Sequence, residues 1–124
     1  KIRKKLLNLS AENQVLKPGY LNGRHFSTYV EDVQQLLRQN ETNKAKNLLR
    51  ELINATENQN KELNCGVAPW YYEALSKIYR KEKDYQSEVL ILERFSKQKH
   101  APGKKPELLM QRLIKAQELA NKKS

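Results

Sequence analysis

The chain contains almost no cysteine, because Cys65 is the only one in 124 residues. A single thiol cannot form an internal disulfide, and chains without disulfides are typical of reducing compartments, so we expect a cytoplasmic protein. Cys65, His25 and His100 also lack the close spacing of metal ligands. The sequence therefore predicts neither a metal site nor a bound cofactor.

Long apolar runs and catalytic motifs are also missing. No stretch reaches the ~18 consecutive apolar residues of a membrane span, and the basic first residues lack the apolar core of a signal peptide. The chain has no glycine-rich phosphate loop, no GxSxG elbow and no HExxH sequence, and neither histidine neighbours an obvious nucleophile. We therefore expect a non-catalytic protein that has no membrane partner.

Glycine and proline number four each, and aromatic residues make up only 7% of the chain. Leucine, lysine, glutamate, glutamine and asparagine are abundant instead, and alternating β-branched residues are absent, which favours helix over strand. The length fits a single domain spanning residues 1–124. Because residue 1 is lysine rather than methionine, we expect the chain to be a fragment of a larger protein.

The segment from Ala68 to Phe95 predicts two antiparallel helices. Pro69 suits the first turn of a helix, where its missing N–H would have no partner anyway. Two apolar stripes with the three-and-four spacing of a helix face follow. They consist of Tyr71, Ala74, Leu75, Ile78 and Tyr79, and of Tyr85, Val89, Leu92 and Phe95 with Ile91 on the flank. The turn at Lys83–Asp84 is so short that the two helices must pair antiparallel.

An earlier segment, residues 26–60, predicts a similar hairpin. Ser27 or Thr28 is expected to cap its first helix, with Glu31 completing a capping box. The two stripes are Tyr29, Val33, Leu36 and Leu37, and Ala45, Leu48, Leu49, Leu52 and Ile53. Residues 1–25 are expected to form a basic end piece with a turn at Asn22–Gly23. Within it, a short amphipathic helix is expected from Ile2, Leu6, Leu7 and Leu9.

Pro106 is expected to begin a final helix. Its apolar face comprises Leu108, Leu109, Leu113, Ala116, Leu119 and Ala120. A stack of hairpins exposes its last apolar face, so this helix is expected to cap it. The predicted fold is all-α without a sheet, with antiparallel helix–turn–helix units at residues 26–60 and 68–99 and a capping helix at 106–123. The expected core contains Leu36, Leu49, Leu52, Leu75, Ile78, Tyr79, Val89, Leu92 and Leu113.

The second hairpin resembles a tetratricopeptide repeat, a helix–turn–helix unit of about 34 residues. The resemblance is carried by Tyr72, Leu75, Ser76, Tyr79, Asp84–Tyr85, Leu92 and Pro102. Glu88 stands where the family has a small residue and Phe95 where it has alanine, and the turn lacks the usual glycine. These departures leave the helix pairing intact, but they do not support the tight interhelical crossing of a regular repeat.

The resemblance implies that the first helix of each pair lines a concave groove. The positions projected onto it are Ser27, Gln34, Trp70, Glu73, Lys77 and Arg80, with Arg112 and Lys115 added by the capping helix. Trp70 lies beside the apolar stripe, so it is a candidate anchor for a partner protein, and the basic residues favour an acidic peptide segment or its carboxyl terminus. The alternative is that Trp70 covers the interhelical loop and that the charges are only solvated.

A second resemblance concerns residues 66–103, which are similar to a helical segment in the C-terminal part of bacterial proteins that carry a HIRAN domain. It implies a bacterial cytoplasmic setting and attachment to a DNA-binding module. Of the net charge of +10, residues 1–25 carry six basic and one acidic side chain, and residues 70–124 carry thirteen and seven. Three functions remain open: a protein-interaction scaffold, a basic module that contacts nucleic acid weakly and without specificity, and a structural extension of a larger protein.

Overall fold

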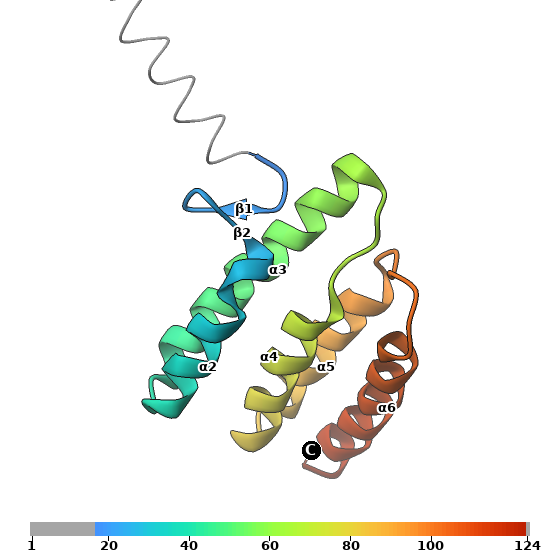
Figure 1. Ribbon diagram of the computed structural model, residues 1–124. Coiled ribbons are helices and arrows are strands. Elements are labelled where there is room, and N and C mark those ends of the chain that lie inside the picture. The colour runs from blue at the N-terminus through green and yellow to red at the C-terminus, as the bar shows by residue number, and fades with distance from the viewer. Residues whose placement is uncertain (1–16, 124) are drawn as a thin grey trace, which may run out of the picture.

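The computed structural model describes residues 17–123 of the chain. Within that range, a short β-hairpin precedes five α-helices that pack against one another (Figure 1). The helices are α2 (Val30–Arg38), α3 (Thr42–Leu63), α4 (Pro69–Lys81), α5 (Tyr85–Ser96) and α6 (Lys105–Lys123). The predicted all-α class is confirmed. The short amphipathic helix expected near Leu6 lies outside the described residues.

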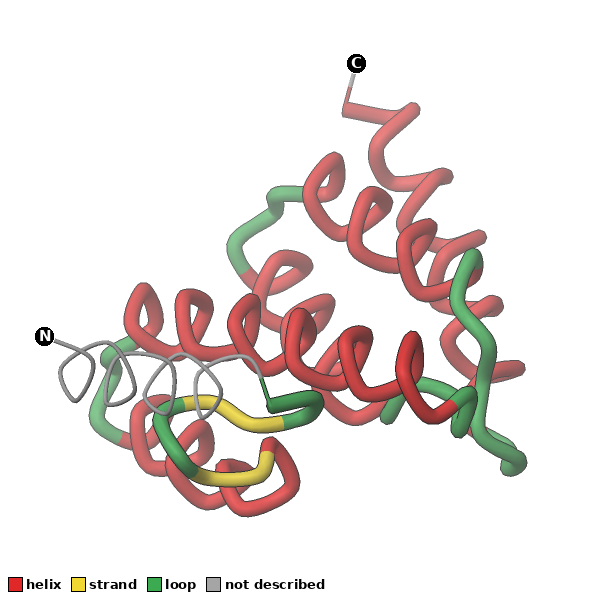
Figure 2. The backbone as a smooth tube through the Cα atoms, turned by 90° about the horizontal axis from the view of Figure 1, so that it is seen from above, coloured by secondary structure: helices red, strands yellow, loops and turns green. Residues whose placement is uncertain are grey.

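Successive helices alternate in direction. In the view of Figure 1 the chain runs down α2, up α3, down α4, up α5 and down α6. Each helix contacts the next one along the chain, and α6 also contacts α4. Seen from above in Figure 2, the β-hairpin lies at one edge of the molecule and the end of α6 lies at the opposite edge. The architecture is therefore two antiparallel helical hairpins followed by a C-terminal helix that covers α5.

Helix α4 begins and ends where its sequence dictates. Pro69 occupies the first turn, and the helix stops before Lys83, whose φ of 60° is left-handed. Asp84 then caps α5 by accepting a hydrogen bond from the backbone N–H of Ser87 at 3.2 Å. These local signals produce the tight turn between α4 and α5 that the sequence predicts.

The buried face of α4 carries two tyrosines at the centre of the core. The Tyr71 hydroxyl donates to the carbonyl of Phe26 at 2.8 Å, and burial raises the pKa of Tyr71 to about 12. The Tyr72 hydroxyl donates to Glu57 at 2.6 Å, and Arg94 of α5 donates to the same carboxylate at 2.7 Å. Burial and the adjacent Glu57 carboxylate raise the pKa of Tyr72 far above its usual value. This cluster joins α3, α4 and α5.

The segment before α2 differs from the prediction. Strands β1 (Tyr20–Leu21) and β2 (Arg24–His25) pair antiparallel, although no sheet was expected. The residues between them, Asn22 and Gly23, both have positive φ, which matches the twist of a two-residue hairpin turn. A local turn signal was therefore read correctly, but the pairing of its short flanks was not foreseen.

The predicted capping box is wrong. A short 3-10 helix, η1 (Phe26–Tyr29), comes before α2, and the His25 ring caps it by accepting from the backbone N–H of Ser27 at 3.2 Å. The side chain of Thr28 turns back to the carbonyl of His25. Glu31 pairs with Arg38 at 2.6 Å instead of capping. Neither Ser27 nor Thr28 caps α2, because the preceding 3-10 turn makes Tyr29 the N-cap residue of that helix.

Most of the expected core is buried, but α5 is rotated relative to its predicted stripe. The expected core residues that are buried are Leu49, Leu52, Leu75, Ile78, Tyr79, Leu92 and Leu113. Leu36 and Val89 are only partly buried, whereas Glu88 is completely inaccessible. The inward face of α5 therefore contains Glu88, Ile91, Leu92 and Phe95.

Two arginines make the burial of Glu88 possible. Arg80 of α4 donates to Glu88 Oε1 at 3.0 Å, and its other nitrogen lies 2.9 Å from Oε2. Arg112 of α6 lies 3.1 Å from Oε2 and donates to Ser76 at 2.8 Å. Both guanidinium groups thus lie within ion-pair distance of Glu88 Oε2. Burial beside Arg80 lowers the pKa of Arg112, although Glu88 opposes that shift.

Candidate partner-binding groove

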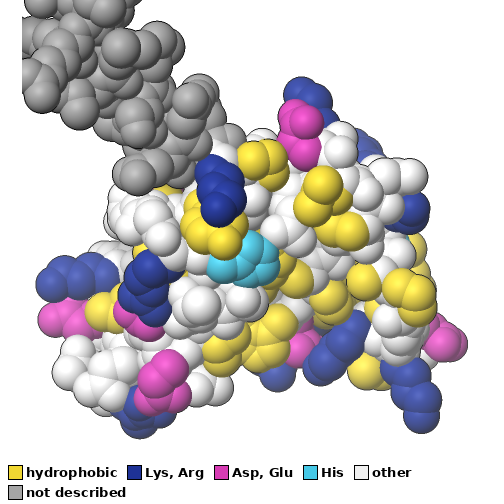
Figure 3. Space-filling model, turned by 45° about the horizontal axis from the view of Figure 1, so that its top comes forward, with side chains coloured by type: hydrophobic (Ala, Val, Ile, Leu, Met, Phe, Trp, Pro, Cys, Tyr) yellow, Lys and Arg dark blue, Asp and Glu magenta, His cyan; other side chains and the backbone are white. Residues whose placement is uncertain are grey.

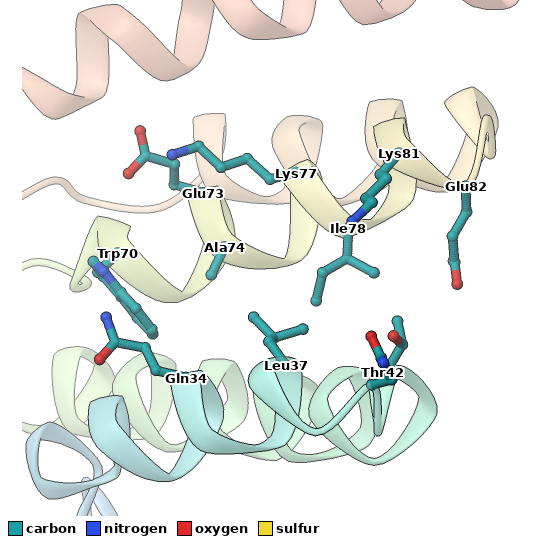
Figure 4. A pocket seen from close by; sticks show the side chains of 11 residues that line it. Gln34, Leu37, Thr42, Trp70, Glu73, Ala74, Lys77, Ile78, Lys81 and Glu82 are labelled. Atoms are coloured by element: carbon teal, nitrogen blue, oxygen red, sulfur yellow. The ribbon is translucent and has the colours of Figure 1, made fainter.

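A groove of about 660 Å³ lies between α2 and α4 (Figure 4). Both helices are the first members of their hairpins, and the loop after α2 closes one end. Its lining consists of Gln34, Leu37, Asn40, Thr42, Trp70, Glu73, Ala74, Lys77, Ile78, Lys81 and Glu82. The α4 residues among them recur at three-and-four spacing, so one face of the helix is presented along the groove.

The floor of the groove is apolar. Trp70, Ala74 and Ile78 point from α4 toward α2, and Leu37 faces them from the other side (Figure 4). Trp70 is partly buried and packs its ring against Tyr71 edge to face at 5.2 Å. Leu37 is one of the large apolar residues that stay exposed, at 36%. The groove thus offers water-exposed apolar surface next to a positioned aromatic ring.

Among the charged side chains at the rim of the groove, the acidic ones have ion-pair partners and, among the described residues, the basic ones do not. Glu73 accepts from Lys105 of α6 at 2.8 Å, and Glu82 accepts from Lys46 of α3 at 2.8 Å. Lys77 and Lys81 are exposed, and no side-chain partner for either is found among residues 17–123. Because both acids are neutralised by lysines that do not line the groove, the unpaired charge at its rim is positive.

The structure brings together four of the projected site residues and leaves four elsewhere. Gln34, Trp70, Glu73 and Lys77 line the groove. Arg80 and Arg112 turn toward Glu88, where they neutralise a buried charge. The remaining two are Lys115, which lies 3.8 Å from Glu118 on α6, and Ser27, which contacts the His25 ring at 2.8 Å.

Sequence reasoning left several groove residues out of the site. They are Leu37, Asn40, Thr42, Ala74, Ile78, Lys81 and Glu82. Lys81 was detectable, since it lies one turn after Lys77 on the same helix face. Leu37 was placed on the inner face of its helix, and only the structure shows that α4 stays far enough away to leave it exposed. The loop residues had no sequence signal.

On the face shown in Figure 3, lysine and arginine side chains are scattered rather than gathered, and several lie beside acidic ones. Several are paired, as in Arg24 with Asp32 at 3.0 Å and Arg94 with Glu57 at 2.7 Å. Within residues 17–123 no cluster of three potential metal ligands occurs, and no helix has the length and apolar character needed to cross a membrane.

The groove combines an apolar floor, an aromatic ring and positive charge that is unpaired among the described residues. Comparison of the chain with protein-family models, with curated proteins and with solved structures gives no significant match in any of the three.

Proposed function

We propose that this chain is a non-catalytic protein-interaction scaffold that binds an acidic peptide segment of a partner protein in the α2–α4 groove. The observation that carries the proposal is the pair Lys77 and Lys81, which stand unpaired at the rim among the described residues while Glu73 and Glu82 are neutralised from outside. An acidic segment would supply the missing counter-charges.

Affinity would come mainly from the apolar floor, and selectivity from the charges. Exposed ion pairs contribute only about 0–1 kcal/mol each, so two lysines alone cannot hold a partner. A large aromatic side chain such as Trp70, placed in a groove and partly buried, is typical of the anchors that dominate binding energy. Complementary charge would then steer the partner and disfavour basic segments.

The architecture supports the tetratricopeptide-like interpretation within this proposal. The groove follows the first helix of each hairpin, α2 and α4, which is where the resemblance places a partner-binding surface. The proposal itself rests on the residues of the groove and does not depend on that resemblance.

The test uses Trp70, the only tryptophan of the chain, as a fluorescent reporter in the groove. Short acidic peptides with apolar residues, capped at both ends, are titrated at low salt because screening weakens exposed charge pairs. We expect a saturable change in Trp70 emission. The double variant Lys77→Glu and Lys81→Glu should weaken binding at least tenfold, equivalent to about 1.4 kcal/mol.

The matched control is the double variant Lys61→Glu and Lys97→Glu. Both lysines are exposed at the ends of α3 and α5 and lie outside the groove lining, and the change in net charge is the same. Peptide affinity should change less than twofold in this control. Equal losses in both variants would mean that overall charge, rather than the groove, attracts acidic molecules, and would contradict the proposal.

A further inference from the structure

We propose that a second, smaller pocket of the protein binds a small organic carboxylate that carries an apolar group. The pocket has a volume of about 210 Å³ and lies where α3, α4 and α5 meet. We call it the Arg50 pocket, and its lining consists of Arg50, Leu75, Tyr79, Ser87, Leu90, Ile91 and Arg94. It shares no residue with the lining of the α2–α4 groove, so this proposal does not depend on the proposed function.

Arg50 gives this pocket a positive charge that no acid compensates. Within residues 17–123 every other arginine lies within ion-pair distance of an acidic side chain, whereas Arg50 has no acidic partner. Arg94, the other cation of the lining, is neutralised by Glu57, whose carboxylate accepts from two of its nitrogens at 2.7 Å. Among the described residues, no acid lines the pocket. An anion bound here would therefore meet a cation that has no competing counter-charge.

The polar groups of the lining have hydrogen-bond donors to spare. The Arg50 guanidinium donates to Asn47 at 2.8 Å and to the Tyr79 hydroxyl at 3.0 Å, which uses two of its five N–H groups. The Tyr79 oxygen accepts that bond, so its own proton has no acceptor among residues 17–123. The Ser87 hydroxyl has no partner in that range either, because Asp84 accepts only from its backbone N–H. Spare donors beside an uncompensated cation suit an anionic acceptor.

The rest of the lining is apolar. Leu75 and Ile91 are buried, whereas Leu90 is 66% exposed although it is a large apolar residue. Apolar walls with a few polar groups are typical of small-molecule sites, and drug-sized ligands occupy roughly 300–1,000 Å³. A pocket of about 210 Å³ therefore suits a smaller molecule with one charged end and one apolar end. The apolar end would cover Leu90.

A carboxylate is the anion that these groups fit best. Its two oxygens match the planar fork of a guanidinium group. Its single negative charge also balances the single uncompensated charge of Arg50, whereas a phosphate monoester carries close to two charges at neutral pH. The hydroxyls of Tyr79 and Ser87 are further donors in the same lining.

Benzoate is the probe, and benzamide is its neutral counterpart of nearly the same shape. The whole chain, labelled with the nitrogen-15 isotope, is titrated by NMR in a low-salt buffer without carboxylates, because salt screens exposed charges. We expect benzoate to cause saturable shifts in the backbone amide signals of Ser87 and Leu90. Benzamide should bind about fivefold or more weakly, because it has no charge to pair with Arg50. Acetate should also bind more weakly than benzoate, because it has almost no apolar surface to bury.

Substitutions test the assignment to Arg50. Arg50→Gln should weaken benzoate binding about fivefold or more, and Arg50→Lys should restore part of that loss because it keeps the charge but not the fork. Ser87→Ala should weaken binding about twofold without lowering the free energy of unfolding, because the hydroxyl has no partner among the described residues. The matched control is Arg38→Gln, which removes the same charge from an exposed position of α2 outside the pocket. It should change the affinity less than about twofold.

Three results would overturn the proposal. Equal affinity for benzoate and benzamide would show that the pocket takes up apolar molecules whatever their charge. Equal losses in Arg50→Gln and Arg38→Gln would show that overall charge attracts the anion. The third is a large loss in the double variant Lys77→Gln and Lys81→Gln, which would place benzoate in the α2–α4 groove. Loss of peptide binding in that groove, by contrast, would leave the benzoate result unchanged, so the two proposals fail separately.

Discussion

Glu88 occupies a position on α5 where a small side chain would let three helices approach closely. Instead the structure buries its carboxylate completely and surrounds it with Arg80 from α4 and Arg112 from α6. A second link runs from Arg80 to the backbone carbonyl of Arg112 at 3.0 Å. A buried charge is tolerated only when it is paired, so the two arginines are required by Glu88 and are not available to a partner.

Replacement of Glu88 by alanine tests this interpretation. The change leaves two largely enclosed guanidinium groups without a counter-charge, so we expect a loss of roughly 3–5 kcal/mol in the free energy of unfolding. The control is Glu31→Ala, which removes an exposed partner of Arg38 and should cost about 0–1 kcal/mol. Urea denaturation followed by helical circular dichroism measures both. Equal losses would show that the buried cluster does not hold α6 in place.

The same cluster explains which part of the site could be predicted from the sequence. The tetratricopeptide-like resemblance projected Trp70, Glu73 and Lys77 onto one surface of α4, and all three line the groove. The resemblance could not exclude Arg80 from this surface, because the direction of a long side chain depends on the charged groups that neighbouring helices present. The attracting group, Glu88, lies on another helix, and periodicity within α4 contains no information about it.

At the scale of the elements, two connecting loops contact each other. The loop after α3 and the loop after α5 lie side by side, with Val67 donating to the carbonyl of Lys99 at 2.8 Å and pairing with His100. Gly66 has a φ of +86°, and a Cβ there would lie 2.5 Å from the backbone nitrogen of Ala101. Contact between two loops whose contacting residues, Val67 and Lys99, lie 32 positions apart could not be predicted from local sequence signals.

Alanine substitution at two glycines separates backbone strain from this loop contact. Gly23 has a similar φ of +80°, but a Cβ there meets nothing within 4 Å. Gly23→Ala should therefore cost about 1–2 kcal/mol, the penalty for a left-handed alanine. Gly66→Ala should cost a further ~1–3 kcal/mol, because the two loops must move apart. Denaturation of the two variants in parallel measures the loss of unfolding free energy in each. Equal losses would mean that the contact between the two loops contributes nothing to stability.

At the scale of the whole molecule, a chain of short hairpins becomes one unit through polar links that cross from element to element. Tyr71 joins α4 to η1, Tyr72 joins α4 to α3 and α5, and the Glu88 cluster joins α4 and α5 to α6. The all-α class followed from composition and periodicity, since apolar stripes suffice to define helices. The polar cross-links did not follow from the sequence, because each joins residues that are distant along the chain and that form no recognisable motif on their own.

Alkaline unfolding should report on this cooperativity. In the folded state the pKa of Tyr71 is raised to about 12 and that of Tyr72 is raised further, whereas tyrosines of the unfolded chain release their proton near pH 10. Folding therefore favours the protonated hydroxyls: the stabilisation is fully present below about pH 10 and is lost as the pH rises toward and through about 12. For Tyr71 alone the difference corresponds to roughly 2–3 kcal/mol. We expect the helical signal to disappear in this window together with the rise of tyrosinate absorbance.

The variant Tyr71→Phe separates the tyrosine effect from the general deprotonation of lysines at high pH. At neutral pH it should be less stable by about 1 kcal/mol, because the hydrogen bond to Phe26 is lost. Its alkaline transition should nevertheless be shallower, since phenylalanine has no proton to release and one of the two groups that favour the unfolded chain at high pH is gone. If wild type and variant lose the same stability between pH 10 and 12, the lysines rather than the buried hydroxyls govern alkaline unfolding.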